Sequence, residues 1–151
     1  MAAGVAAVLR ERFPKIRIFG VEEDGQNSMQ LSLQSGHRQT LPQISHFCDG
    51  TAVATPGKLT QPLCAELLDA VWTVNERDVC TAIEWLWNEL RVVVEPSAGI
   101  GVAAALITCG AMQSTHVELN SAIKQLGLPT NPRMLTVLSG SNVDFMTLAS
   151  I

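Results

Sequence analysis

Three short polar stretches carry the residues whose types could do chemistry. They are residues 22–25, 95–101 and 139–142, and each follows an apolar run typical of a β-strand. In open α/β sheets ligands bind beyond the carboxyl ends of the strands, so these stretches are candidate binding positions. Small residues in 139–142 would let the backbone approach a ligand closely, but they are equally typical of an ordinary capped turn.

The middle stretch leads into a Gly-x-Gly-x-x-Ala motif at residues 99–104, with Glu118 about 20 residues further on, as in a dinucleotide-binding fingerprint. Glu95, Pro96 and Ser97 separate this motif from the apolar run before it. Small residues on an Ala-rich helix more often allow close helix-to-sheet packing. We therefore favour packing over nucleotide binding, with Ser97 as a helix N-cap and Glu95 as a carboxylate near the helix start.

Other chemically active residues match no established pattern. His46, Cys48 and Asp49 lack the spacing of a zinc site. The carboxylates of residues 22–24 could offer oxygen ligands to a hard cation, but a solvated turn is the preferred interpretation. No Gly-x-Ser-x-Gly elbow surrounds Ser139 or Ser141, so a hydrolase is not indicated.

Composition excludes several classes of protein. The 151 residues are 47% hydrophobic and 16% charged, with a net charge of −4, so neither disorder nor general nucleic-acid binding is expected. The longest apolar runs fall far short of the roughly 20 residues that span a bilayer, so no membrane association is expected. The four cysteines form no Cys-x-x-Cys pair, which favours a reducing, cytoplasmic compartment. An organelle is the alternative, because a fragment would have lost any targeting segment.

Helical and strand patterns alternate along the chain. Helices are predicted over residues 1–10, 28–34, 59–68, 75–90, 96–109 and 117–126, and strands over 16–21, 71–74 and 134–138, with a short apolar run at 92–94. Gly36 is the expected C-cap of the second helix, and residues 37–58 form a long ordered loop. This alternation predicts an α/β fold with a mostly parallel sheet and helices on both faces.

Five motifs, in order along the chain, resemble the pyridoxal-phosphate-dependent threonine dehydratases, serine dehydratases and serine racemases of fold type II. They are Ala-Gly-Val-Ala at 3–6, Ile-Phe-Gly-Val-Glu at 18–22, Phe-Cys-Asp-Gly-Thr-Ala-Val at 47–53, Val-Glu-Pro-Ser-Ala-Gly at 94–99 and Leu-Ser-Gly-Ser-Asn-Val-Asp at 138–144. Each motif is short, but together and in this order they are specific. The resemblance extends over essentially all 151 residues.

The resemblance implies pyridoxal 5'-phosphate as cofactor and assigns roles to particular positions. The family counterpart of Ser139 hydrogen-bonds the pyridine nitrogen of the cofactor. Gly140 and Asn142 would shape that turn, and Glu95 and Gly50 match family positions near the ring. A serine is a weak acid, so it would leave the nitrogen largely unprotonated, which suits loss of an α-proton and a β-hydroxyl better than transamination.

Metal binding is weakly supported by the same resemblance. Some relatives bind a divalent cation with the glutamate that matches Glu22 and with an acid six residues later. That later position is Ser28 in this chain. Glu22 is therefore the one candidate metal ligand, and the set is incomplete.

Parts of the family pattern are absent from the chain. The segment with the Schiff-base lysine, the Ser-x-Gly-Asn-His-type loop and the glycine run that holds the phosphate have no counterpart, and Lys15, Lys58 and Lys124 match no cofactor-attaching position. The resemblance therefore identifies residues 1–151 as the C-terminal part of a dehydratase catalytic domain, an incomplete fold-type-II large domain.

The predicted function is part of an L-threonine (or L-serine) ammonia-lyase that converts a hydroxy amino acid to a 2-oxo acid and ammonia, with this chain alone inactive. The stretches 41–42 and 92–96 are closest to biosynthetic threonine dehydratases, which implies isoleucine biosynthesis. The expected partners are the missing N-terminal half, or self-association, and a homo-oligomer when the enzyme is complete. The alternatives are a non-catalytic or split-enzyme module that pairs with another chain, and a serine racemase-like enzyme.

Overall fold

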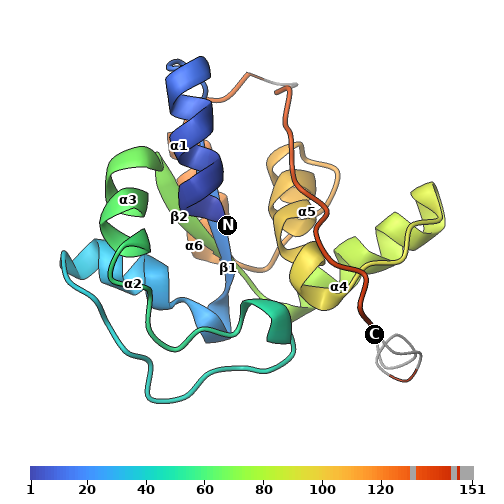
Figure 1. Cartoon of the computed structure of the whole chain (residues 1–151). Coiled ribbons are helices and arrows are strands. Elements are labelled where there is room, and N and C mark those ends of the chain that lie inside the picture. Colours follow the sequence, from blue (N-terminus) through green and yellow to red (C-terminus); the bar gives the residue numbers. More distant parts are fainter. Residues whose placement is uncertain (130–131, 144–145, 147–151) are drawn as a thin grey trace.

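A computed structural model describes residues 1–129, 132–143 and 146. Two parallel strands lie among six helices, and the segment after the last helix runs back past the N-terminal end of α5 (Figure 1). The elements are α1 (Ala2–Arg12), β1 (Phe19–Glu23), the 3-10 turn η1 (Asp24–Gln26), α2 (Ser28–Ser35), η2 (Asp49–Thr51), α3 (Thr60–Leu67), β2 (Ala70–Val74), α4 (Glu76–Trp85), the π-helical turn η3 (Leu86–Leu90), α5 (Pro96–Thr108) and α6 (Val117–Gln125).

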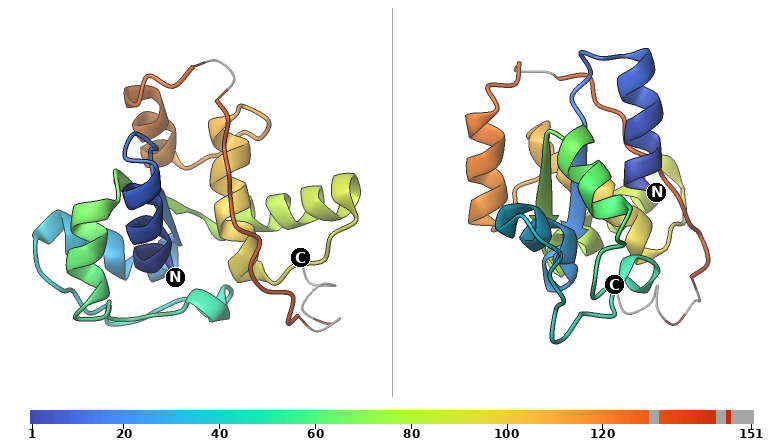
Figure 2. Two further views of the ribbon diagram at one scale, coloured as in Figure 1. Left: turned by 45° about the horizontal axis from the view of Figure 1, so that its top comes forward. Right: turned by 60° about the vertical axis from the view of Figure 1, so that its left-hand side comes forward.

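The sheet consists of β1 and β2, paired in parallel from Phe19 opposite Ala70 to Glu23 opposite Val74. Parallel neighbours need a crossover, which α2, the long loop and α3 provide. The rings of Phe19 and Trp72 stack across the pair with centroids 4.3 Å apart. Figure 2 shows the strands between α6 on one side and α3 with α1 on the other. The predicted α/β fold with helices on both faces of a parallel sheet is confirmed.

The strand predicted over 134–138 does not form, and the apolar run at 92–94 is not a strand either. Residues 92–94 and 134–138 are irregular, although their composition is typical of β-structure. A strand requires a neighbour that shares its backbone hydrogen bonds, and within the described residues neither segment has one. Leu135 is 87% exposed, so the apolar side chains of 134–138 have no covering layer there. The prediction of a strand over 134–138 is therefore wrong for this structure.

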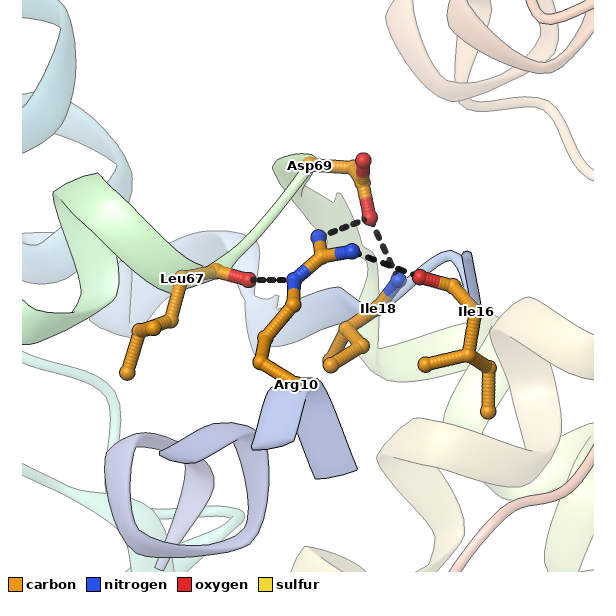
Figure 3. A network of polar contacts seen from close by, with 5 residues as sticks. All are labelled: Arg10, Ile16, Ile18, Leu67 and Asp69. Carbon is orange, nitrogen blue, oxygen red and sulfur yellow. Dashed lines mark hydrogen bonds and ion pairs between the residues drawn. The ribbon is translucent and has the colours of Figure 1, made fainter. Parts of the chain in front are cut away.

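The first strand begins later than predicted, because a polar network takes up residues 16–18. The guanidinium of Arg10 donates to the carbonyls of Leu67 (2.9 Å) and Ile16 (2.7 Å) and to Asp69 Oδ2 (2.7 Å). The same Asp69 oxygen accepts from the Ile18 N–H at 2.6 Å (Figure 3). Arg10 thus ties α1 to the start of β1 and to the turn before β2.

Predicted helix ends agree well with the structure. Gly36 closes α2 in the left-handed region at φ 75°. Asn75 Oδ1 accepts from the Asp78 N–H at 2.8 Å and so caps α4. The helix predicted over 75–90 continues from α4 into η3 and ends at Arg91, the one described non-glycine residue with positive φ.

The core lies where α4 and α5 pack together and against the sheet. Val74, Val79, Ala82 and Ala103 are completely buried there. A Cβ on Gly99 would lie 3.0 Å from Ile83 Cγ1, so this glycine allows the two helices to approach closely. Both Gly99 and Gly101 lie inside α5 and not in a loop before it. Gly99 of the Gly-x-Gly-x-x-Ala motif therefore serves close packing, but against helix α4 and not against the sheet as expected.

The longest described helix, α5, has 13 residues, and none of the described helices has the length and apolar character needed to cross a membrane.

Candidate cofactor site

A cavity of about 420 Å³ lies between β1, the 45–57 loop and the start of α5. Its wall includes four predicted site residues: Glu22, Gly50, Glu95 and Ser139. They come from strand β1, the turn η2, the residue before α5 and the C-terminal segment. The structure therefore brings together residues that are up to 117 positions apart (139 − 22) in the sequence.

Glu95 links the two sides of this cavity. It is the N-cap residue of α5, where the positive end of the helix favours a carboxylate. Its N–H donates to the Gly140 carbonyl at 3.2 Å, and its Oε2 accepts from the Asn142 N–H at 3.3 Å. Gly140 and Asn142 therefore act through Glu95, and this contact holds the turn that carries Ser139 against the start of α5.

Two glycines lie close to the Glu95 carboxylate: Gly140 in the C-terminal segment and Gly50 in the turn η2. A Cβ on Gly140 would lie 2.3 Å from Glu95 Cδ, and the φ of Gly140 is +109°. A Cβ on Gly50 would lie 2.9 Å from both Glu95 Oε1 and Ser97 Oγ. Only glycine fits at Gly140, and any larger residue at Gly50 would push the loop away from α5.

Ser97 has a different place from the one predicted. Because α5 begins at Pro96 and Glu95 is its N-cap, Ser97 lies inside the first turn and is not the cap. Its hydroxyl oxygen is buried, borders the cavity and has no hydrogen-bond partner in the structure. A buried hydroxyl without a partner is costly, so a ligand that supplied one would be stabilised. The proline at the first helical position is the sequence signal for this shift.

Both carboxylate oxygens of Glu22 are engaged in hydrogen bonds of the fold. Its two carboxylate oxygens accept from the N–H groups of Met29 (3.0 Å) and Gln30 (2.8 Å) in the first turn of α2. Burial is the main cause that raises the pKa of Glu22, and these two bonds oppose it. Ser28, at the expected second ligand position, donates to the Val53 carbonyl at 2.7 Å. In the part of the chain that the structure describes, no three His, Cys, Asp or Glu residues gather as a metal site.

The sequence indicated a solvated turn at residues 22–24, but Glu23 is buried there and only Asp24 is exposed. Glu23 is 2% exposed, and its Oε1 accepts from the Gly25 N–H at 2.9 Å, while Oε2 is buried without a partner. Burial, together with the neighbouring Asp24, raises the pKa of Glu23 to about 7. Burial also raises the pKa of Cys48 to about 12, so this thiol stays protonated and inert.

A model of the family described as "Pyridoxal-phosphate dependent enzyme" matches residues 1–119. The chain is 35% identical over 145 residues to L-threonine dehydratase biosynthetic IlvA of Burkholderia multivorans, a match that covers 96% of this chain and 26% of that protein. It is 34% identical over 145 residues to threonine dehydratase 1 biosynthetic, chloroplastic, of Solanum lycopersicum, covering 96% of this chain and 22% of that protein. The chain thus spans about a quarter of the length of these relatives.

Solved structures give the same relationship. The processed form of threonine deaminase isoform 2 from Solanum lycopersicum superimposes with a TM-score of 0.81 at 31% identity, covering 99% of this chain and 39% of that one. Maize serine racemase superimposes with a TM-score of 0.79 at 32% identity, covering 98% of this chain and 42% of that one. The chain therefore belongs to the family of pyridoxal-phosphate dependent enzymes.

Proposed function

We propose that residues 1–151 form the C-terminal part of the catalytic domain of an L-threonine (or L-serine) dehydratase. The observation that carries this proposal is the convergence of Gly50, Glu95 and Ser139 on one cavity, with Gly140 and Asn142 bonded to Glu95. The dehydratase names of the relatives support the reaction class. The products from threonine would be 2-oxobutanoate and ammonia, and from serine pyruvate and ammonia.

The residues present fit one side of pyridoxal 5'-phosphate. The unpartnered Ser97 hydroxyl and the Ser139 hydroxyl offer polar contacts in a cavity otherwise bordered largely by apolar side chains. Gly50 borders the same cavity and brings the loop backbone close to Glu95 and Ser97. Once bound, this cofactor withdraws the electrons left on the substrate carbon after proton removal.

Each site residue has a proposed role. The Ser139 hydroxyl keeps its proton and donates a hydrogen bond to the ring nitrogen. Glu95 orients the 139–142 turn by accepting from the Asn142 N–H and donating to Gly140. Gly50 closes the opposite side of the ring position. Because a serine hydroxyl is a weak acid, a ring nitrogen bonded to Ser139 would stay largely unprotonated, which favours elimination of the β-hydroxyl over transamination.

No lysine lies in the described cavity wall. Lys15, Lys58 and Lys124 are all exposed, and none of them borders the cavity. We therefore propose that a lysine from outside these residues completes the site and that the chain alone has no dehydratase activity. Formation of 2-oxobutanoate by the purified chain with pyridoxal phosphate and threonine would contradict this.

Complementation tests the proposal directly. The chain would be co-expressed with the segment of the Burkholderia multivorans dehydratase that precedes the matched 145 residues. We expect ammonia and 2-oxobutanoate from threonine in the mixture and from neither part alone. Ser139→Ala should lower the rate about tenfold or more, the value of one hydrogen bond of about 1.4 kcal/mol. A folded, co-purifying pair without activity toward threonine or serine would refute the proposal.

The exposed side chains of residues 134–138 support the need for a second part. Leu135 is 87% and Val137 53% exposed, and such apolar segments mark interaction surfaces. We propose that the remainder of the enzyme covers them, and that the complete enzyme is a homo-oligomer. Size-exclusion chromatography of the chain with and without the added segment distinguishes this arrangement from a lone module that pairs with an unrelated chain.

Racemisation is the second candidate reaction, and the likeness to maize serine racemase favours it. The same complemented pair, supplied with L-serine, would then form D-serine as well as pyruvate, and chiral chromatography would separate the two outcomes. We propose a cytoplasmic location, with an organelle as the alternative, since the tomato relative is named chloroplastic. Cell fractionation of the natural source decides between these locations.

A further inference from the structure

A buried amide beside the cavity holds one wall of the proposed site. Gln26 ends η1, borders the cavity and is 2% exposed. Its Nε2 donates to the carbonyls of Ser45 (3.0 Å) and Cys48 (2.9 Å), and its Oε1 accepts from Thr51 Oγ1 at 3.0 Å. Both N–H groups and one lone pair of the amide are therefore used, and all three partners lie in residues 45–51.

The segment 45–51 has little other regular structure. Only the single turn η2 is helical, and the segment contacts η1 through one further backbone bond, from the Ser45 N–H to the Gly25 carbonyl at 3.0 Å. Three of these four hydrogen bonds thus belong to one side chain. Because the partners of Nε2 are two carbonyls, the position requires a donor amide and cannot be served by a carboxylate.

The place of Gly50 depends on this attachment. Gly50 lies between two of the anchored residues, Cys48 and Thr51, and it faces Glu95 Oε1 and Ser97 Oγ with space for a hydrogen but not for a Cβ. Gln26 itself reaches neither Glu95 nor Ser97 in the hydrogen bonds of the structure. Its effect on that side of the cavity must therefore pass through the loop.

We propose that Gln26 is a positioning residue that holds Gly50 against the Glu95 and Ser97 side of the cavity. That this side of the cavity binds a cofactor rests on the proposed function. Gln26 sets the width of the gap between the loop and α5, and without its amide the loop moves outward and the gap widens.

A double-mutant cycle on the chain, read by urea unfolding without cofactor, tests the proposal. Gly50→Ala alone introduces a Cβ 2.9 Å from two oxygens, and we expect the unfolding equilibrium constant to rise about tenfold. In the Gln26→Met background the loop is released and can move aside. In that background, the rise in the unfolding equilibrium constant caused by Gly50→Ala should be about fivefold smaller. A coupling of this size is typical of residues that share one contact. If Gly50→Ala raises the unfolding equilibrium constant equally, within about twofold, in the unchanged chain and in Gln26→Met, the proposal is overturned.

Gln39→Met is the matched control. Gln39 lies in the same long loop, but its amide bonds to Ser35 Oγ (3.1 Å) and the His37 ring (2.7 Å), away from Gly50. Its combination with Gly50→Ala should be additive. If Gln39→Met and Gly50→Ala were coupled as strongly as Gln26→Met and Gly50→Ala, the cause would be a general loosening of the loop. That result would also overturn the proposal.

Hydrogen exchange keeps the proposal testable if Gln26→Met does not fold. Thr51→Val keeps the side-chain shape but removes the hydroxyl that bonds to Gln26 Oε1 and to the Cys48 carbonyl, and amide exchange over 45–51 should become about threefold faster or more. Unchanged exchange would contradict the proposal. Because neither measurement involves catalysis, an inactive complemented enzyme would refute the proposed function without touching this result, and an additive cycle would refute only the role of Gln26.

Discussion

The α4–α5 region and the cavity region are held together by different forces. Between α4 and α5 the contacts are apolar, with Val79, Ile83 and Gly99 interdigitated. Around the cavity, irregular segments are held by side chains that bond to backbone, such as Glu22 to the start of α2 and Gln26 to the 45–51 loop. The first region contains α5, and the proposed site residues Glu95 and Ser97 lie at the N-terminal end of that helix.

This difference predicts how each region responds to substitution. Apolar packing is lost gradually with the volume removed, whereas a network of directed bonds fails when one donor or acceptor is lost. Substitutions in the core should therefore change global stability, and those around the cavity should mainly change local position and pH response.

The largest effect is expected in the core. Ile83 is 4% exposed and packs against Gly99, so Ile83→Ala leaves a cavity between the two helices. We expect a loss of about 3 kcal/mol in the free energy of unfolding, measured by urea titration. The exposed Ile16→Ala, at 37% exposure, is the control and should cost far less. A small effect at Ile83 would mean that the helices can close the gap.

Glu23 should produce the next largest effect, through pH. Its pKa is about 7 in the folded state because of burial and Asp24, against 4.5 for a free glutamate. The folded state therefore binds more protons than the unfolded state between these values, and stability falls as pH rises from about 4.5 to about 7. Glu23→Gln should raise the unfolding free energy by about 2 kcal/mol above pH 7 and change it little below pH 4.5. A pH-independent difference would contradict this cause.

Gly140→Ala should affect the cavity more than overall stability. A Cβ there would collide with the Glu95 carboxylate, and φ +109° is unfavourable for alanine. We expect a loss of about 1 kcal/mol and faster amide exchange at residues 139–142, while exchange in α4 stays unchanged. Gly110→Ala shares a positive φ but has open space around its Cβ, so it separates backbone strain from collision. Equal effects of the two substitutions would exclude the collision.

Arg10→Met should have the smallest effect of the four. The Arg10–Asp69 pair is partly exposed, at 25% and 31%, so solvent screens the charge and the two carbonyl bonds matter most. We expect a loss of about 0.5 kcal/mol, detected by thermal unfolding. Asp69→Asn keeps an acceptor for Ile18 and should cost less. A larger cost for Asp69→Asn would indicate that the charge dominates.

Sequence patterns located most helices and caps but misjudged the polar residues of the cavity region. Gly36 is predicted as a helix C-cap because local geometry alone makes a glycine favourable at a helix end. Glu23 and Gln26 were missed, because nothing in their neighbours along the chain shows that a loop some 20 residues away will bury them. Ser97 was assigned to a cap one position away from where the helix begins.

The sequence by itself determined the helices, the two paired strands and the family resemblance, since periodicity, capping and short motifs depend on neighbouring residues. Tertiary structure alone decided that Glu22 binds a helix N-terminus, that 134–138 lacks a partner strand among the described residues, and that Gly50 and Gly140 flank Glu95. These outcomes depend on contacts between segments far apart in the chain. Neighbouring residues in the sequence do not show whether a distant segment will supply a hydrogen-bonding partner or a covering surface.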